Sequence, residues 1–410
     1  MKRKRYGSFL ELCRNGTKEQ VAEVINKWIR PDQQGRFLVE AIRLRYPLKV
    51  LKILLDAGAD VNLADENGNT PLQLLFLSDE SMKEKEWEAW PESIYEGTDL
   101  LAPGEQTAAA VQLFLDAGAD LNSRDQYGNT LLMRAAGNSD VQSVALLLKL
   151  GVDVHARNDY GKTPLLMATT RHTDLQTITL LIEAGADVNA RDVNEHTPLI
   201  NAAGSAHCPQ ALSLLIEAGA DVNARDVFGN TPLINAAGSA FYRQTLSFLL
   251  ELGADVNARN CFGDTPLLKA AEYPWANTQN FVPMLIEAGA DVNVQNRNGD
   301  TPLLHATGWN DNLQTISSLV KAGADVNTRN NNGDTPLFNA INRYSCPQTL
   351  SLLIEAGADV NGRDRNGDTP LLKAMNYADP EVISLLIEAG AMATATSQEL
   401  AGRGKDERVK

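Results

Sequence analysis

Histidine and cysteine side chains are the first candidates for chemistry in this chain, because they bind metal ions and act as bases or nucleophiles. The 410 residues include five histidines and four cysteines. None of them forms a His-x-x-x-His or Cys-x-x-Cys pair, which are common spacings of metal sites. We therefore expect no metal site, no cofactor and no cysteine nucleophile. The residues concerned are His155, His172, His196, His207, His305, Cys13, Cys208, Cys261 and Cys346.

Glycine-rich and carboxylate motifs are also present, but their spacing does not suit catalysis. Gly-Asn-Thr-Pro and Gly-Asp-Thr-Pro lack the Gly-Lys-Ser/Thr end of a phosphate-binding loop, and no Gly-x-Ser-x-Gly elbow occurs. One aspartate and one arginine recur at regular spacing, which indicates structural ladders rather than an acid–base pair. We expect exposed pairs between these ladders, each worth about 0–1 kcal/mol. The sequence predicts a protein that is not an enzyme.

The charge balance narrows the class of partner. The formal net charge is −15, which disfavours binding to nucleic acid or to an anionic membrane surface. No stretch approaches the ~18 consecutive apolar residues of a membrane span. The cysteines form no disulfide framework, which fits a reducing compartment and predicts a cytoplasmic protein.

A repeat that runs through most of the chain sets the positions of these residues. Thr-Pro-Leu, or a close variant, recurs at steps of 33 to 36 residues after Thr130. Gly-Ala-Asp-Val-Asn keeps the same phase from Gly58 to a stub at Gly390. Such a period is typical of a stacked array of short units. The repeated threonines are Thr70, Thr130, Thr163, Thr197, Thr231, Thr265, Thr301, Thr335 and Thr369.

Each repeat carries the signals of two short helices and an extended finger. Thr197 is a good N-cap, and Pro198 in the first helical position gives up an N–H that would lack a partner there. A second apolar run, 211–217, ends before Gly219, the type of residue that follows a helix in the left-handed conformation. Residues 226–229 predict a turn. Such units bury their apolar faces only against neighbours, so the repeats must stack.

The pattern Asp-x-x-Gly-x-Thr-Pro-Leu-x-x-Ala, followed by Leu-Leu-x-x-Gly-Ala-Asp-Val-Asn, resembles the ankyrin repeat. The resemblance covers roughly residues 7–391. It implies an all-α fold with short β-hairpin fingers, a solenoid of about ten helix–turn–helix repeats plus an N-terminal helical cap. The family often has His after Thr-Pro-Leu, whereas this chain has mostly apolar residues, so we expect apolar contacts between repeats. These residues are Gln73, Met133, Leu166, Ile200, Ile234, Leu268, Leu304, Phe338 and Leu372.

The repeat pattern divides the chain into three parts. Residues 1–35 are predicted to form the N-terminal helical cap, residues 36–391 the ankyrin-repeat array, and residues 392–410 a charged tail. An insertion at about residues 78–106 interrupts the array. It has no His or Cys, which argues against catalysis, but it contains Trp87, Trp90 and Tyr95. The insertion is either a surface loop that the fold tolerates or a segment that binds a partner through its aromatic residues. Both interpretations stay open.

Exposed positions that vary between repeats are the candidates for binding. The resemblance implies that finger tips and the first helix of each repeat line a concave groove. The first candidate group, in the C-terminal half, is Tyr273, Trp309, Arg343, Tyr377, Lys269, His305 and Lys373. The second group, at the finger tips, is Tyr127, Tyr160, Phe228 and Phe262. Tyr, Trp and Arg are typical of interface hot spots, but packing on a neighbouring finger also explains the tip aromatics.

The leading hypothesis is a non-enzymatic scaffold that binds a protein or peptide of basic or mixed charge in its groove. One alternative is an effector delivered into a host cell, where it binds a host protein. Another is a self-assembling structural protein, because the last outer helix, 382–387, is apolar where a terminal repeat needs a polar face. We expect a monomer, with end-to-end association through the C-terminal repeat as the alternative.

Overall fold

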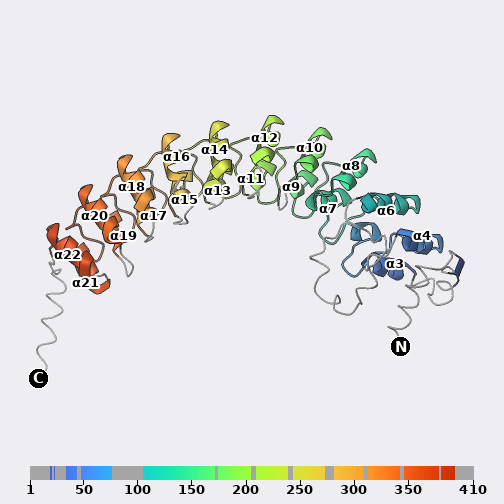
Figure 1. Cartoon of the computed structure of the whole chain (residues 1–410), viewed down its shortest axis with the longest axis horizontal. Coiled ribbons are helices and arrows are strands. Elements are labelled where there is room, and N and C mark those ends of the chain that lie inside the picture. Colours follow the sequence, from blue (N-terminus) through green and yellow to red (C-terminus); the bar gives the residue numbers. More distant parts are fainter. Residues whose placement is uncertain are drawn as a thin grey trace, which may run out of the picture. The chain divides into compact units, whose positions relative to one another are not determined.

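The protein is described by a computed structural model that covers residues 19–20, 23, 34–43, 48–75, 105–170, 174–204, 209–238, 243–272, 281–308, 313–341, 346–377 and 380–392. The chain divides into two compact units, Met1–Ala220 and Asp221–Lys410. Both units are built from pairs of short helices joined by extended fingers (Figure 1). Within these ranges no residue belongs to a β-strand.

The first unit contains five helix pairs in its described ranges. The first helices of successive pairs contact one another, as α7 and α9 do, and the second helices do the same, as α8 and α10 do. The helices therefore form an inner and an outer row. The pairs are α3 (Gln34–Arg43) with α4 (Leu48–Asp56), α5 (Pro71–Leu74) with α6 (Glu105–Asp116), α7 (Leu131–Gly137) with α8 (Val141–Lys149), α9 (Pro164–Ala168) with α10 (Leu175–Glu183), and α11 (Pro198–Ala203) with α12 (Pro209–Glu217).

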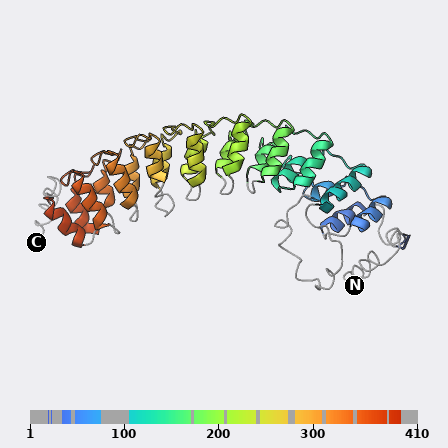
Figure 2. The ribbon, with the colours of Figure 1, turned by 45° about the horizontal axis from the view of Figure 1, so that its top comes forward.

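The second unit also contains five described helix pairs, with an inner row that runs from α13 to α21 and an outer row from α14 to α22. Figure 2 shows its fingers running along one edge of this stack. The pairs are α13 (Pro232–Ala237) with α14 (Arg243–Glu251), α15 (Pro266–Glu272) with α16 (Phe281–Glu287), α17 (Pro302–Thr307) with α18 (Leu313–Lys321), α19 (Pro336–Ala340) with α20 (Pro347–Glu355), and α21 (Pro370–Tyr377) with α22 (Pro380–Glu388).

The inner helices begin as the Thr-Pro motif predicts. The side-chain oxygen of Thr231 accepts a hydrogen bond of 3.3 Å from the main-chain N–H of Ile234, and Pro232 occupies the first turn. Each such cap satisfies one donor that the helix leaves free, and is worth about 1 kcal/mol. The outer helix α14 is followed by Gly253, which has a φ of +82° and turns the chain into the next finger.

The expectation of apolar contacts between repeats is confirmed in the described residues. The side chains that follow Thr-Pro-Leu are almost fully buried from Met133 to Phe338, and Leu372 in the last repeat is half-buried. Gln73 is the polar exception and is also buried. Its Oε1 accepts a hydrogen bond of 2.9 Å from the N–H of Thr70, which completes a capping box.

The fingers differ from the predicted β-hairpins. The finger at Asp226 is closed by its N–H donating to Asn230 O at 3.1 Å, and Gly229 N–H donates to Asp226 O at 2.8 Å. Neighbouring fingers share single main-chain bonds, such as that from Cys261 N to Phe228 O at 2.7 Å. A strand ladder needs repeated bonds along both segments. The described fingers are therefore turns rather than paired strands.

Several predicted parts lie mainly outside the described residues. Before residue 34 only Glu19, Gln20 and Glu23 are described, and they are helical and exposed. In the predicted insertion, residues 78–104 lie outside the described ranges, with Trp87, Trp90 and Tyr95 among them. The predicted tail is described only at Met392. The boundaries of the cap, the insertion and the tail thus stay predictions.

Candidate functional site

The aromatic finger tips form pairs across neighbouring repeats. In the first unit, the rings of Tyr127 and Tyr160 are 6.4 Å apart and tilted by 36°. In the second unit, the rings of Phe228 and Phe262 are 6.3 Å apart and nearly parallel, at 22°. Contact within each pair leaves about half of every ring in solvent: Phe228 is 52% and Phe262 54% exposed. Packing on a neighbouring finger therefore accounts for only part of each ring.

Side chains beneath the rings fix the tips. One carboxylate oxygen of Asp226 accepts from the N–H groups of Phe228 and Asn230, at 2.9 and 2.8 Å. In the next repeat, the side-chain oxygen of Asn260 accepts from the N–H of Phe262 at 2.9 Å. The amide of Asn260 also donates to the side-chain oxygen of Asn230 at 2.9 Å. These Asx turns hold the two tips in register and present both rings on the same edge.

Arginines of the ladder reach main-chain oxygens of the neighbouring finger. Arg225 Nη1 donates to the main-chain oxygen of Arg259 in the next finger at 2.7 Å, and the guanidinium of Arg259 donates to the oxygen of Gln295. An exposed pair does occur between Arg191 and Glu195, at 2.8 Å. Carbonyl groups are the partners because they project between adjacent fingers within reach of the long arginine stem.

The fingers that carry Phe228 and Phe262 expose charges of both signs, with Asp221 and Asp255 exposed before each tip. Arg225 and Arg259 are exposed, whereas the carboxylates of Asp226 and Asp264 are buried within the fingers. Burial raises the pKa of Asp264, but hydrogen bonds from Asn296 and the ammonium of Lys269 outweigh it and hold the pKa below 3.8. Asp264 therefore stays ionised at neutral pH as an internal anchor.

The polar row on the inner helices is engaged by the fingers. Lys269 Nζ lies 3.2 Å from Asp264 Oδ2 and 3.0 Å from Glu272 Oε2. Burial lowers the pKa of Lys269, but these two carboxylates outweigh burial and raise the pKa above 10.5. His305 Nε2 lies 3.8 Å from Asp300 Oδ2. Both side chains reach carboxylates of the fingers, and the Lys269 ammonium is paired there.

Lys373 has a different environment. Its ammonium donates to the main-chain oxygen of Phe338 at 2.6 Å and lies 5.1 Å from the centre of the Phe338 ring. Burial lowers the pKa of Lys373 below 10.5, and the nearby charges of Asp334 and Asp364 offset this only in part. Lys373 thus bridges two repeats rather than presenting a free charge.

The predicted C-terminal group is only partly described. Tyr273, Trp309 and Arg343 lie outside the described residues, and Tyr377 ends α21 with its side chain not described. In sequence these residues follow the C-terminal ends of inner helices, whereas the tips precede the N-terminal ends. A helix of seven residues is about 10 Å long. Whether the two candidate groups share one surface therefore stays a prediction.

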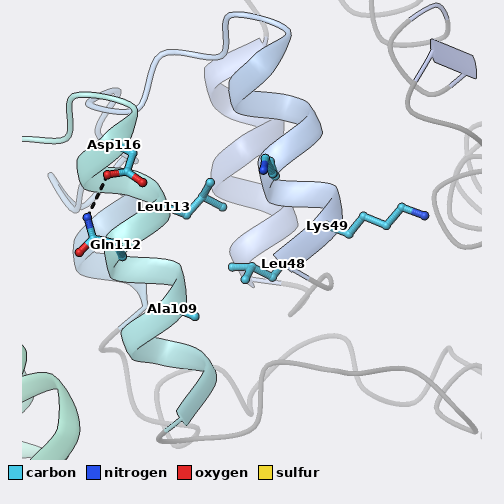
Figure 3. Close-up of a pocket in the computed structure, with 7 residues that line it drawn as sticks. Leu48, Lys49, Ala109, Gln112, Leu113 and Asp116 are labelled. Carbon is cyan, nitrogen blue, oxygen red and sulfur yellow. Dashed lines mark hydrogen bonds between the residues drawn. The ribbon is translucent and has the colours of Figure 1, made fainter.

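A shallow hollow lies between α4 and α6 in the first unit (Figure 3). It has a volume of about 480 Å³ and is lined by Leu48, Lys49, Lys52, Ala109, Gln112, Leu113 and Asp116. Its one internal polar contact joins Gln112 Nε2 to Asp116 Oδ1 at 2.9 Å. The lining offers no nucleophile with a base beside it, so the hollow does not resemble a catalytic site.

Two further properties concern the whole described part of the chain. No group of three or more His, Cys, Asp or Glu side chains there could hold a metal ion. None of the helices found there is both long and apolar enough to cross a bilayer.

An asparagine ladder was missed by reasoning from the sequence. Asn293 Nδ2 donates to Gly323 O at 3.1 Å, and its Oδ1 accepts from Asp325 N at 2.8 Å. Asn257, Asn327 and Asn361 make the same pair of contacts with the following repeat. The sequence did contain a signal for this ladder, the recurring asparagine of Gly-Ala-Asp-Val-Asn. An amide side chain that recurs at one repeat position indicates that it bonds the same donor and the same acceptor in each repeat.

Stacked helix pairs with hydrogen-bonded fingers define a helical repeat protein whose exposed, variable residues lie at the finger tips. Four overlapping segments match the family model described as ankyrin repeats (3 copies): residues 101–192, 171–260, 240–330 and 304–397. They run together from residue 101 to residue 397, which is more than half of the chain. The chain belongs to the ankyrin-repeat family.

Similarity to solved structures was found for 561 chains. One is the crystal structure of the ankyrin repeat domain of Bcl-3, described as a unique member of the IkappaB protein family. It is 30% identical, covers 55% of this chain and 98% of that chain, and has a TM-score of 0.47. No curated protein matches the chain. Ankyrin repeats are in general protein–protein interaction modules, typically without catalytic activity.

Proposed function

We propose that this protein is a non-enzymatic scaffold that binds a partner protein through its finger tips. The stacked pair of Phe228 and Phe262 supports this proposal most directly. Both rings are more than half exposed, although each sits on a turn fixed by side-chain hydrogen bonds beneath it. Exposed aromatic groups on a rigid surface are typical of interface anchors, because little conformational entropy is lost when they are covered.

The charge around the rings specifies the partner further. Arg225 and Arg259 expose guanidinium groups in the fingers that carry the pair, whereas the carboxylates of Asp226 and Asp264 are buried. A partner segment with an apolar group flanked by carboxylates would match this surface. The partner of basic or mixed charge that the net charge of −15 favours stays the alternative.

Affinity capture with the full chain tests the proposal. The wild type is compared with a Phe228→Ala, Phe262→Ala variant and with a Gln314→Ala control on the exposed surface of α18. We expect one protein to be retained by the wild type and the control and lost with the aromatic variant. Because guanidinium groups contribute, retention should also weaken as salt is raised. Equal retention by all three forms would refute the finger-tip site.

The cellular setting is a separate part of the proposal. A cytoplasmic scaffold and an effector acting in a host cell would use the same tips, and they differ in the cell that contains the partner. Capture from a lysate of the source cell, and from a lysate of a host cell, separates the two settings. A partner present in the source cell supports the scaffold, which we favour because the cysteines form no disulfide framework.

A further inference from the structure

The last repeat ends on side chains that earlier repeats bury. In the second unit, the seventh residue of each Thr-Pro motif is almost fully buried wherever another inner helix follows, as at Ala237, Ala271, Thr307 and Ile341. The corresponding residue of the last repeat is Met375, which is 61% exposed. Met375 is exposed because α21 is the last described inner helix, so no later inner helix packs against it.

The outer row ends in the same way. Leu246, Val282, Ile316 and Leu350 are completely buried at one position of successive outer helices. Ile383, at this position of α22, is only partly buried, and Ile387 one turn later is 57% exposed. Leu372, Met375, Ile383 and Ile387 therefore continue the surface with which repeats pack on one another, and with Met392 at its edge they are defined here as the C-terminal face.

Met392 departs from the repeat pattern at the edge of the C-terminal face. Its main-chain N–H donates to Asn361 Oδ1 at 2.8 Å, as the N–H of Asp359 does to Asn327 Oδ1. Met392 thus occupies the place of the exposed aspartate in Gly-Ala-Asp. It is 58% exposed, so an apolar side chain replaces a charge at an edge open to water. A polar residue would be expected there if water were the only contact.

We propose that the C-terminal face pairs with the same face of a second copy of this chain. Methionine is flexible and is enriched at protein interfaces, and two of its seven occurrences in the chain lie on this face. The face is apolar in every copy, so two copies can cover each other's exposed apolar side chains. A two-fold pairing buries both faces at once and closes, as in most homodimers.

Residues 393–410 have a composition that is unfavourable for covering the C-terminal face. They contain two large apolar residues, Leu400 and Val409, among many polar and charged ones. Five apolar side chains of the face need a larger apolar surface than these two provide. The pairing is independent of the proposed finger-tip site, because it uses other residues.

Sedimentation equilibrium of the full chain over a range of micromolar concentrations tests this pairing. We expect a mass that rises from one chain of 44.5 kDa to a limit of two chains. Ile387→Glu, and Met392→Asp, which restores the residue type of earlier repeats, should each raise the dissociation constant by on the order of tenfold or more. Val227→Asp, at an exposed apolar finger position, should leave the dissociation constant unchanged.

Thermal unfolding establishes that each variant is folded before its mass is interpreted. A wild type that stays at one chain overturns the proposal, as does a dimer that Ile387→Glu and Met392→Asp leave intact. Masses that keep rising beyond two chains contradict the closed pair. A monomeric wild type that associates after Leu400→Asp would show instead that the chain's own residues 393–410 cover the face.

Discussion

The side chain of Asn327 donates a hydrogen bond of 3.0 Å to the main-chain oxygen of Gly357, thirty positions further along the chain. The same side chain accepts a bond of 2.8 Å from the N–H of Asp359. One amide thus satisfies both a donor and an acceptor of the next repeat. Equivalent asparagines link the fingers of the second unit, so the stack is held by polar contacts at its edge as well as by its apolar core.

Asn327→Asp should destabilise the C-terminal repeats by about 1 kcal/mol, because a carboxylate cannot donate to Gly357 and lies close to Asp359. Asn332→Asp is the matched control, since it introduces the same charge at an exposed tip. We expect the control to change stability by less than about 0.5 kcal/mol. Urea unfolding followed by circular dichroism measures both. Equal effects of the two substitutions would show that the amide bridge contributes nothing.

Glycines at two positions of the repeat should respond differently to alanine. Gly299 and Gly323 both have positive φ, at +77° and +88°. A Cβ on Gly299 would lie 2.9 Å from the main-chain nitrogen of Asn331 in the next finger, whereas a Cβ on Gly323 meets nothing within 4 Å. Gly323→Ala should therefore cost about 1 kcal/mol from the backbone alone, and Gly299→Ala about 2–3 kcal/mol. Thermal unfolding of both variants measures the difference, and similar losses would mean that the fingers are not in close contact.

The ion pair between Asp125 and Arg134 predicts a pH dependence. Burial raises the pKa of Asp125, but hydrogen bonds from Asn129 and Tyr127 and the charge of Arg134 outweigh it and hold the pKa below 3.8. A carboxyl whose pKa is lower when folded stabilises the fold above its unfolded pKa. That stability is lost as the pH falls below about 4 and through the folded pKa. The lowered pKa values of Asp65, Asp264 and Asp300 act in the same direction.

Asp125→Asn tests this dependence. Asn158 makes the same turn with an amide in the next repeat, so the variant should keep its local fold. We expect it to be less stable than the wild type by about 1–2 kcal/mol at pH 7, because Arg134 loses its carboxylate partner. The difference should shrink at pH 3, where the wild type also loses the charge. Melting temperatures of the variant and the wild type are measured at the two pH values. Asp159→Asn, at an exposed tip, is the control. A difference in stability that is the same at both pH values would contradict the assigned pKa shift.

The tip aromatics should contribute little to stability. Phe262→Ala removes a ring that is half exposed, so we expect a loss of less than about 1.5 kcal/mol. Leu267→Ala, five residues further along in α15, removes a fully buried side chain and should cost about 2–5 kcal/mol. Urea unfolding compares the two. A loss at Phe262 as large as that at Leu267 would make the ring a structural element and would weaken the case for a binding role.

The helices and their stacking could be predicted from local signals. Thr231 and Pro232 favour the start of a helix, and Gly253 ends the following helix. Both effects act within one helical turn, so they do not depend on distant residues. The apolar residue after Thr-Pro-Leu also indicated the buried contact between repeats. These features depend on residues close together in the chain.

Contacts between repeats could not be predicted in the same way. Arg225 could reach many groups, and only the spacing of adjacent fingers shows that the oxygen of Arg259 accepts a hydrogen bond from it. The sequence likewise left open whether Phe228 and Phe262 pack on each other or face solvent. The structure shows both, because the spacing of neighbouring tips allows stacking but leaves half of each ring uncovered.

Site-specific photo-crosslinking tests the finger-tip site most directly. A photoreactive phenylalanine analogue is placed at Phe262 and, in a second preparation, at Gln314 on the exposed surface of the outer row. Each full-length protein is irradiated with the partner obtained by affinity capture. The proposed site predicts a covalent adduct from position 262 and none from position 314. An adduct from position 314 alone, or equal adducts from both, would contradict binding at the finger tips.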